Sequence, residues 1–187
     1  MSLRCLKKGS LVVRNMQKII PINTKLLKED VSLLRSLLEV SMYDISVICI
    51  SKSRMRNLNI ESCRNDHVSE VLSFPFNDGS FDGTLLTPKT SCDYNLGDIF
   101  LCPPLIEEKR LQRGLSLRVN MVRYVAHSMC HLMGYRHDTD KNWRIMLRKE
   151  QELLSLFSYV RGIKVEAAYE VKHHIPQLGT MWLVPNI

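Results

Sequence analysis

Three histidines fall in one short window of the sequence, at positions 127, 131 and 137, with a glycine at position 134. On a helix, His127 and His131 would share a face, with Cβ atoms about 6 Å apart. Both imidazoles can then reach one zinc ion at about 2.0–2.1 Å each. Gly134 permits a chain reversal that brings His137 to the same ion. Three nitrogen ligands leave a fourth tetrahedral position open, as catalytic sites require. The spacing therefore predicts one zinc-type ion per chain.

The residue after the first histidine argues against one known use of this spacing. The pattern HxxxHxxGxxH also occurs in metzincin proteases, which need a glutamate directly after the first histidine as general base. That position is Ser128 here. A hydroxyl cannot do this work, so the spacing does not indicate a protease. The remaining histidines, His67, His173 and His174, lie outside the window, and we expect them at the surface or in loops.

Length and composition are those of a single globular domain. The chain has 187 residues, of which 45% are hydrophobic and 24% charged, and its net charge of +7 suits a polyanionic partner such as RNA. Six cysteines without a CxxC pair predict no disulfide framework and indicate a reducing compartment, with Cys49 and Cys102 as buried, inert thiols. No apolar stretch approaches the length of about 18 residues that a membrane helix needs.

The first 28 residues contain seven lysines and arginines but no acidic residue, since Glu29 is the first acid in the chain. A basic start without acids resembles a mitochondrial presequence. The alternative is a basic first strand that stays in the folded protein, because residues 11–22 have strand-like apolar content. The sequence leaves both interpretations open.

Helices and strands are expected to alternate along most of the chain. Apolar spacing and cap residues predict helices over 28–40, 51–63 from a Ser51 cap, 115–133 up to Gly134, and 140–157 from a Thr139 cap. Apolar runs predict strands over 44–50, 70–76 and 97–102, the last ended by Pro103 and Pro104, with a loop over 77–96. This order predicts an α+β fold: a small mixed β-sheet packed with helices, and the three-histidine site on a central helix and the turn after it.

The segment AHSMCHLMGYRHDT, residues 126–139, resembles the signature of the YbeY endoribonuclease family, which is close to HGxxHLxGYDH. Three more segments are similar in the same order: residues 12–22 to the first strand of animal members, 69–74 to the family's TDVLSF strand, and 93–101 to its LGDI element. The resemblance covers residues 11–157. It implies one YbeY-like metallo-hydrolase domain over residues 1–158, followed by a C-terminal tail, 159–187, of unknown role.

The resemblance also implies a function. Family members are single-strand-specific, metal-dependent endoribonucleases that mature ribosomal RNA and associate with the small ribosomal subunit. The metal would be zinc, held by His127, His131 and His137. For an animal-type member the expected location is the mitochondrial matrix, with the cytoplasm or the nucleus as alternatives.

Four positions depart from the family pattern: Ser128 replaces a glycine, Arg136 an aspartate and Val68 a proline, and the fourth concerns the essential arginine. The family carries that arginine six residues before its TDVLSF threonine, in an LNxxYR context. Counting back from Ser69 places Cys63 there, with Arg64 as its immediate neighbour. Arg64 is therefore the candidate catalytic arginine. The alternative is a catalytically weakened ribosome-assembly factor that retains a structural metal.

Four other arginines are candidate contacts to RNA phosphates, because guanidinium groups bind phosphate oxygens in pairs. They are Arg54, Arg56, Arg118 and Arg123. A further alternative is a metal-dependent hydrolase of a substrate smaller than RNA, against which the positive net charge argues mildly.

Overall fold

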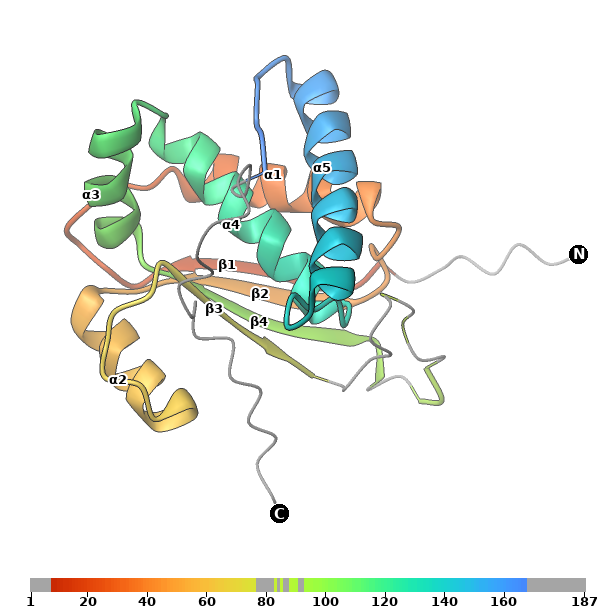
Figure 1. Ribbon diagram of the computed structural model, residues 1–187, viewed down its shortest axis with the longest axis horizontal. Coiled ribbons are helices and arrows are strands. Elements are labelled where there is room, and N and C mark those ends of the chain that lie inside the picture. The colour runs from red at the N-terminus through yellow and green to blue at the C-terminus, as the bar shows by residue number, and fades with distance from the viewer. Residues whose placement is uncertain (1–7, 77–82, 84, 86–87, 91–92, 168–187) are drawn as a thin grey trace, which may run out of the picture.

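A mixed four-stranded sheet lies at the centre of the computed structural model, which describes residues 8–76, 83, 85, 88–90 and 93–167 (Figure 1). Its strands are β1 Leu11–Asn15, β2 Asp44–Cys49, β3 Val71–Pro75 and β4 Asn95–Leu101. They lie in the order β1-β2-β4-β3. Strands β1 and β4 run parallel to β2, and β3 runs antiparallel to β4. The predicted α+β class is confirmed.

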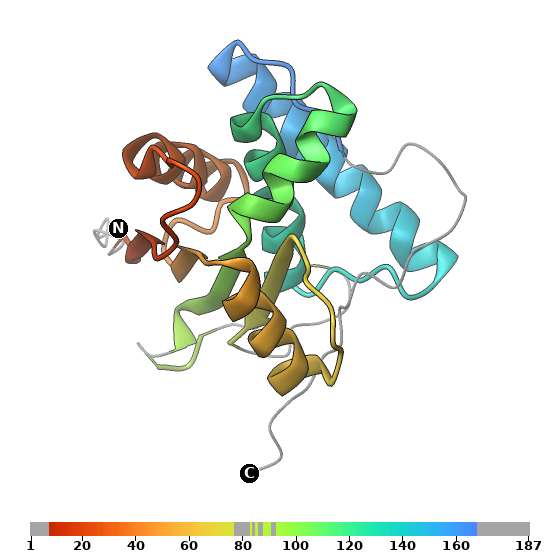
Figure 2. The same cartoon turned by 90° about the vertical axis from the view of Figure 1, so that its left-hand side faces the viewer.

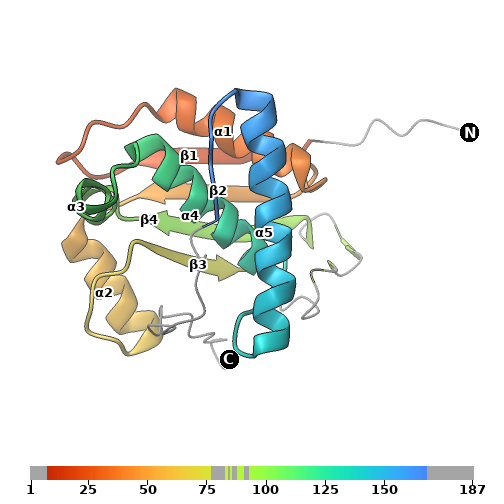
Figure 3. The same cartoon turned by 45° about the horizontal axis from the view of Figure 1, so that its top comes forward.

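Helices cover both faces of this sheet. On one face lie α1 Thr24–Leu37, α3 Pro103–Arg113, α4 Leu117–Leu132 and α5 Asp140–Arg161. Helix α2, Lys52–Cys63, lies on the other face (Figures 1 and 2). Helix α4 crosses the sheet centrally and lies beside α5 (Figure 3). The two sides enclose separate apolar clusters, a large one under α1, α4 and α5 and a small one under α2.

Strand β2 shows how one run of residues serves both clusters. Side chains alternate between the two faces of a strand. Ile45 and Val47 accordingly belong to the large cluster, and Ile48 packs against the small one. Such two-sided burial explains why this segment is an almost continuous apolar run rather than an alternating one.

The helix starts follow from side-chain caps. Ser51 accepts a hydrogen bond from the Arg54 N–H, and Thr139 accepts one from Asn142, which confirms both predicted caps. Helix α4 begins at Ser116, whose hydroxyl accepts from the Val119 N–H at 3.2 Å. Each cap satisfies an N–H group that the first helical turn leaves without a backbone partner.

Helix α3 is absent from the sequence prediction, which assigned Pro103 and Pro104 only the end of a strand. The two prolines occupy the first helical positions of α3. Proline is tolerated there because the first N–H groups of a helix have no backbone partner and its fixed φ suits the helix. The same residues therefore stop β4 and begin α3.

The described residues continue past residue 158, the boundary that the resemblance implies for the domain. Helix α5 runs to Arg161, and Val165 and Ala167 are buried in the large cluster. The rest of the expected tail, 168–187, lies outside the described residues, as do His173 and His174.

At the other end of the chain, residues 11–15 form strand β1, as the strand interpretation predicted. Buried Arg35 donates hydrogen bonds to the carbonyl oxygens of Gly9 and Ser10 and so holds the chain just before β1.

Two cysteines behave as the sequence indicated. Cys49 and Cys102 are both buried. Burial raises the pKa of Cys49 to about 12 and also raises the pKa of Cys102, so both are protonated, unreactive thiols at neutral pH. Among the described residues, no helix is both long and apolar enough to span a membrane.

Candidate metal centre

Helix α4 places the first two histidines of the predicted site side by side. His127 and His131 are both buried on this helix. Their rings meet edge to face, with the two Nε2 atoms 3.0 Å apart. The i, i+4 spacing therefore does what helix geometry predicts, and both imidazoles are directed at one point.

A glycine turn returns the chain to that point. Gly134 has a φ of 91°, in the left-handed region that favours glycine. Its N–H donates to the His131 carbonyl at 2.9 Å, and the Tyr135 N–H donates to the Cys130 carbonyl at 3.1 Å. These bonds end α4 and direct the chain back, so that one ligand atom from each of His127, His131 and His137 lies within 4.8 Å of the others.

The contacts of the Nδ1 atoms explain why the Nε2 atoms of His127 and His131 face each other. His131 Nδ1 lies 3.0 Å from the Tyr135 carbonyl oxygen, and His127 Nδ1 lies 3.2 Å from Glu150 Oε2. Both partners are acceptors, so they favour a proton on each Nδ1 and leave a lone pair on each Nε2. Two lone pairs 3.0 Å apart repel each other unless a cation lies beside both.

The environment of His137 also suits a metal ligand. Its Nε2 is buried, and no hydrogen-bond partner for it exists among the described residues. An orphaned buried nitrogen is costly unless something outside the chain satisfies it. Three buried or half-buried imidazoles with converging Nε2 atoms match the ligand set that zinc-type ions prefer.

Electrostatics favour the same conclusion. Burial, together with the neighbouring rings of His127 and His137, holds the pKa of His131 well below its ordinary value. Burial and the His127 ring likewise lower the pKa of His137. Both histidines are therefore uncharged at neutral pH and ready to donate a lone pair to a cation.

The predicted catalytic arginine lies at the end of α2. Arg64 is the exposed C-cap of this helix, in the left-handed conformation with a φ of 51°. Cys63, at the position of the family arginine, is only 6% exposed and belongs to the small apolar cluster. Buried Asn59 holds the loop that follows, since its Nδ2 donates to the His67 carbonyl and to Ser69 Oγ, each at 3.0 Å. The helix end thus exposes Arg64 and buries Cys63.

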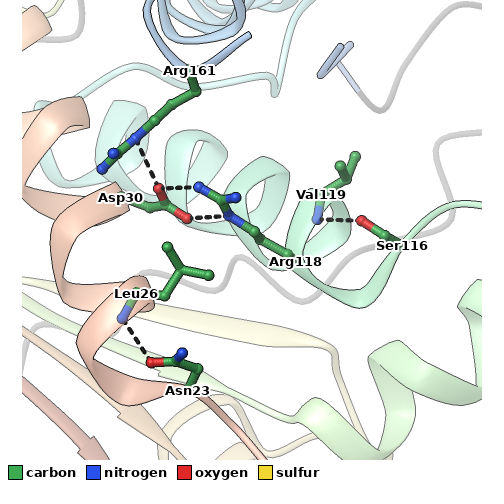
Figure 4. A network of polar contacts seen from close by, with 7 residues as sticks. All are labelled: Asn23, Leu26, Asp30, Ser116, Arg118, Val119 and Arg161. Carbon is green, nitrogen blue, oxygen red and sulfur yellow. Dashed lines mark hydrogen bonds and ion pairs between the residues drawn. The ribbon is translucent and has the colours of Figure 1, made fainter. Parts of the chain in front are cut away.

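The four predicted RNA-contacting arginines lie in different environments. Arg118, on α4, is bonded to the buried carboxylate of Asp30, which Arg161 also approaches (Figure 4). Arg56 pairs with Asp66 at the surface. Arg54 is exposed at the start of α2. The structure does not bring these three to the histidines.

Arg123 is the exception among the four. It lies one turn before His127 on α4, half-buried, and donates a long hydrogen bond of 3.4 Å to Asn120 Oδ1. Its Nε has no hydrogen-bond partner among the described residues.

Sequence reasoning missed Glu150, whose carboxylate contacts His127 from helix α5. A signal for it exists. Glu150 falls on the apolar face of α5, at helical spacing from Met146, Leu153, Leu154 and Phe157, all of them buried. An acidic residue on the buried face of the helix that directly follows the histidine window indicates a buried partner.

Comparisons with known proteins agree with this geometry. The family model described as Endoribonuclease YbeY matches residues 12–158. A human protein named Endoribonuclease YbeY is 32% identical over 157 residues, which are 84% of this chain and 93% of the human protein. The Endoribonuclease YbeY of Finegoldia magna is 36% identical over 112 residues, which are 60% of this chain and 67% of that protein.

A solved structure shares the fold. The solution structure of TM1509 from Thermotoga maritima has a TM-score of 0.50 at 19% identity and covers 81% of this chain and 93% of its own. A likeness at that identity concerns the fold alone. The matched family model and the human relative, together with the three converging histidines, establish that this chain belongs to the YbeY family.

Proposed function

We propose that this protein is a metal-dependent endoribonuclease that holds one zinc ion through His127, His131 and His137. The observation that carries the proposal is the convergence of the three imidazoles, whose ligand atoms lie within 4.8 Å of one another. When bound, zinc supplies Lewis acidity and activates water for attack on a phosphodiester. The chain's own part is to hold the three imidazoles in place, through α4 and the turn at Gly134.

RNA is the proposed substrate because the relatives of this chain are named endoribonucleases. We propose single-stranded RNA within ribosomal RNA precursors, acted on during small-subunit assembly, as the family resemblance implies. The net charge of +7 favours a polyanion. Phosphate contacts would then supply most of the affinity, and binding would weaken steeply with salt.

Two arginines are candidates to hold the RNA. Arg123 lies one turn from His127, and among the described residues its guanidinium makes one hydrogen bond, the long one to Asn120. Arg64 is exposed at the end of α2. We propose that Arg123 holds the backbone beside the scissile group and that Arg64 takes the role of the family arginine, while Arg54 adds a more distant contact.

A second candidate function rests on Cys63. A thiol in an apolar cluster cannot contact phosphate as the family arginine would. If Arg64 does not replace it, the protein is a ribosome-assembly factor in which the metal only stabilises the fold.

Cleavage of single-stranded RNA by the zinc-loaded chain tests the proposal. The parent protein should cut the RNA, lose activity on chelation and regain it with added zinc. His131→Ala should stay inactive under all conditions, while His67→Ala, outside the cluster, should behave as the parent does. A zinc-loaded parent that binds the RNA without cutting it would favour the assembly factor.

We also propose that the protein acts in the mitochondrial matrix, as the resemblance to animal members implies. Because residues 11–15 stay in the fold as β1, a targeting signal would lie in the basic segment before that strand. The full-length chain with a C-terminal tag should co-localise with a matrix marker. A purely cytoplasmic or nuclear signal would refute this location.

A further inference from the structure

Glu150 is a carboxylate in an apolar setting. Its side chain is 2% exposed, and the other residues on its face of α5 are hydrophobic. Burying a carboxylate carries a large free-energy penalty unless hydrogen bonds and opposite charge offset it. A leucine or methionine would pack at this position without that penalty. A local contact that needs a carboxylate must therefore account for Glu150.

The contacts of the two carboxylate oxygens identify this requirement. Oε2 lies 3.2 Å from His127 Nδ1, across the interface between α5 and α4. Oε1 is buried and has no hydrogen-bond partner among the described residues. Among the described residues, the hydrogen-bond contact of this buried carboxylate is thus with the first histidine of the metal centre.

We infer that Glu150 is a positioning residue for the metal centre. Its carboxylate accepts the Nδ1–H of His127 and thereby holds the ring with Nε2 directed at the shared point. It also makes the imidazole a stronger ligand and opposes the positive charge of a bound cation. This inference rests on the proposed metal binding by the three histidines, and it adds a residue to the site that the ligand spacing does not contain.

The same contact joins metal binding to the packing of α5. His127 belongs to α4, His137 to the turn after it, and Glu150 to the third turn of α5. A cation bound by the histidines strengthens the attraction between His127 and Glu150, so it stabilises α5 against α4. Replacing Glu150 should therefore weaken zinc binding and reduce the stabilisation that zinc gives to the fold.

Zinc affinity of the full-length protein, measured by competition with a chromophoric chelator, tests the inference directly. Glu150→Ala should bind zinc about 10–100-fold more weakly than the parent, the range found for outer-shell partners of metal ligands. Glu150→Gln keeps an oxygen acceptor without the charge and should lie between the two. Glu152→Gln is the matched control, because Glu152 is 59% exposed and paired with Lys149, and it should bind zinc as the parent does.

A second control separates positioning from general loss of stability. Leu153→Ala removes a buried apolar side chain of α5, which has no acceptor to offer the His127 ring. It should lower the melting temperature of the metal-free protein but leave zinc affinity near that of the parent.

The outcomes distinguish the possible errors. Equal zinc affinity of the parent and Glu150→Ala would overturn the role of Glu150 and leave the metal centre intact. A weakening in Leu153→Ala as large as in Glu150→Ala would also overturn it. A parent that binds no zinc would overturn both the metal centre and this inference.

Discussion

Arg118 donates two hydrogen bonds of 2.8 Å, from Nε and Nη2, to the carboxylate of Asp30, whose side chain is 1% exposed (Figure 4). Arg161 approaches the same carboxylate at 3.1 Å. The three residues come from α4, α1 and α5, so these contacts connect three of the helices on one face of the sheet. An arginine that satisfies a buried carboxylate in this way is held by the fold, and its guanidinium is largely engaged.

Arg118→Met should therefore lower stability more than RNA binding. The change leaves the buried Asp30 carboxylate with the Arg161 ion pair alone among the described residues, at a cost of about 1–3 kcal/mol. For a protein of this size that corresponds to a fall of roughly 2–4 °C in melting temperature per kcal/mol. Thermal denaturation measures it, with exposed Arg54→Met as a control within about 0.5 kcal/mol of the parent. An unchanged melting temperature together with weaker RNA binding would contradict this assignment.

Removing one ligand should empty the metal centre. His131→Ala leaves two histidines, too few for a tight zinc site, so we expect the metal content to fall from about one per chain to near zero. Elemental analysis of purified protein measures this. His67→Ala should retain the metal, because His67 lies in the loop between α2 and β3. Full occupancy in His131→Ala would disprove the ligand set.

The metal-free protein should lose stability in mild acid. Burial lowers the pKa of His131 and His137 in the folded state, whereas an unfolded chain titrates near pH 6.5, so unfolding takes up protons. The stability contribution is fully present above about pH 6.5 and falls as the pH drops through that value toward the lower folded pKa. Urea denaturation of the metal-free chain at about pH 7.5 and about pH 5.5 measures this. His131→Gln should flatten the dependence, and a flat parent curve would count against it.

Substitutions of Cys63 and Arg64 should have opposite effects on stability, because Cys63 is buried in the small apolar cluster and Arg64 is exposed. Cys63→Arg forces a guanidinium into contact with Met55 and Leu72 or drives the end of α2 apart, so it should destabilise the protein by about 2 kcal/mol or more. Arg64→Ala should change stability little, because Arg64 is exposed, but should lower RNA cleavage if Arg64 has taken the role of the family arginine.

Denaturant unfolding and single-strand cleavage at matched zinc occupancy separate these effects. Cys63→Ser, of similar size, serves as the control for the first variant, and Arg14→Ala, at an exposed position of β1, for the second. A stable and more active Cys63→Arg would show that position 63 reaches the substrate after all.

Arg123 should contribute to RNA affinity through phosphate. Arg123→Ala should weaken binding of single-stranded RNA uniformly across sequences and reduce the salt dependence by about one counterion. Fluorescence anisotropy across a salt series measures both quantities. Lys52→Ala is a suitable control, since Lys52, at the start of α2, is paired with Glu108 and should alter the slope less. An unchanged slope in Arg123→Ala would exclude this phosphate contact.

The sequence alone was sufficient to predict the cluster of three histidines. His127 and His131 lie four residues apart within one helix, and Gly134 supplies the turn to His137, so the site depends on local geometry that spacing describes. The caps at Ser51 and Thr139 were predictable for the same reason, because a cap bonds only to its own first turn. Helix α3 was not predicted because Pro103 and Pro104 are compatible both with the end of a strand and with the first positions of a helix.

Only the tertiary structure decided which charged residues belong to the site. Arg118 meets Asp30 across 88 residues of sequence, and Glu150 meets His127 across 23. Helical periodicity tells which side of α5 carries Glu150, but not which helix that side faces. The partner of a buried charge is set by how distant elements pack, and a carboxylate near an imidazole becomes part of a metal centre only when packing brings the two within hydrogen-bond distance.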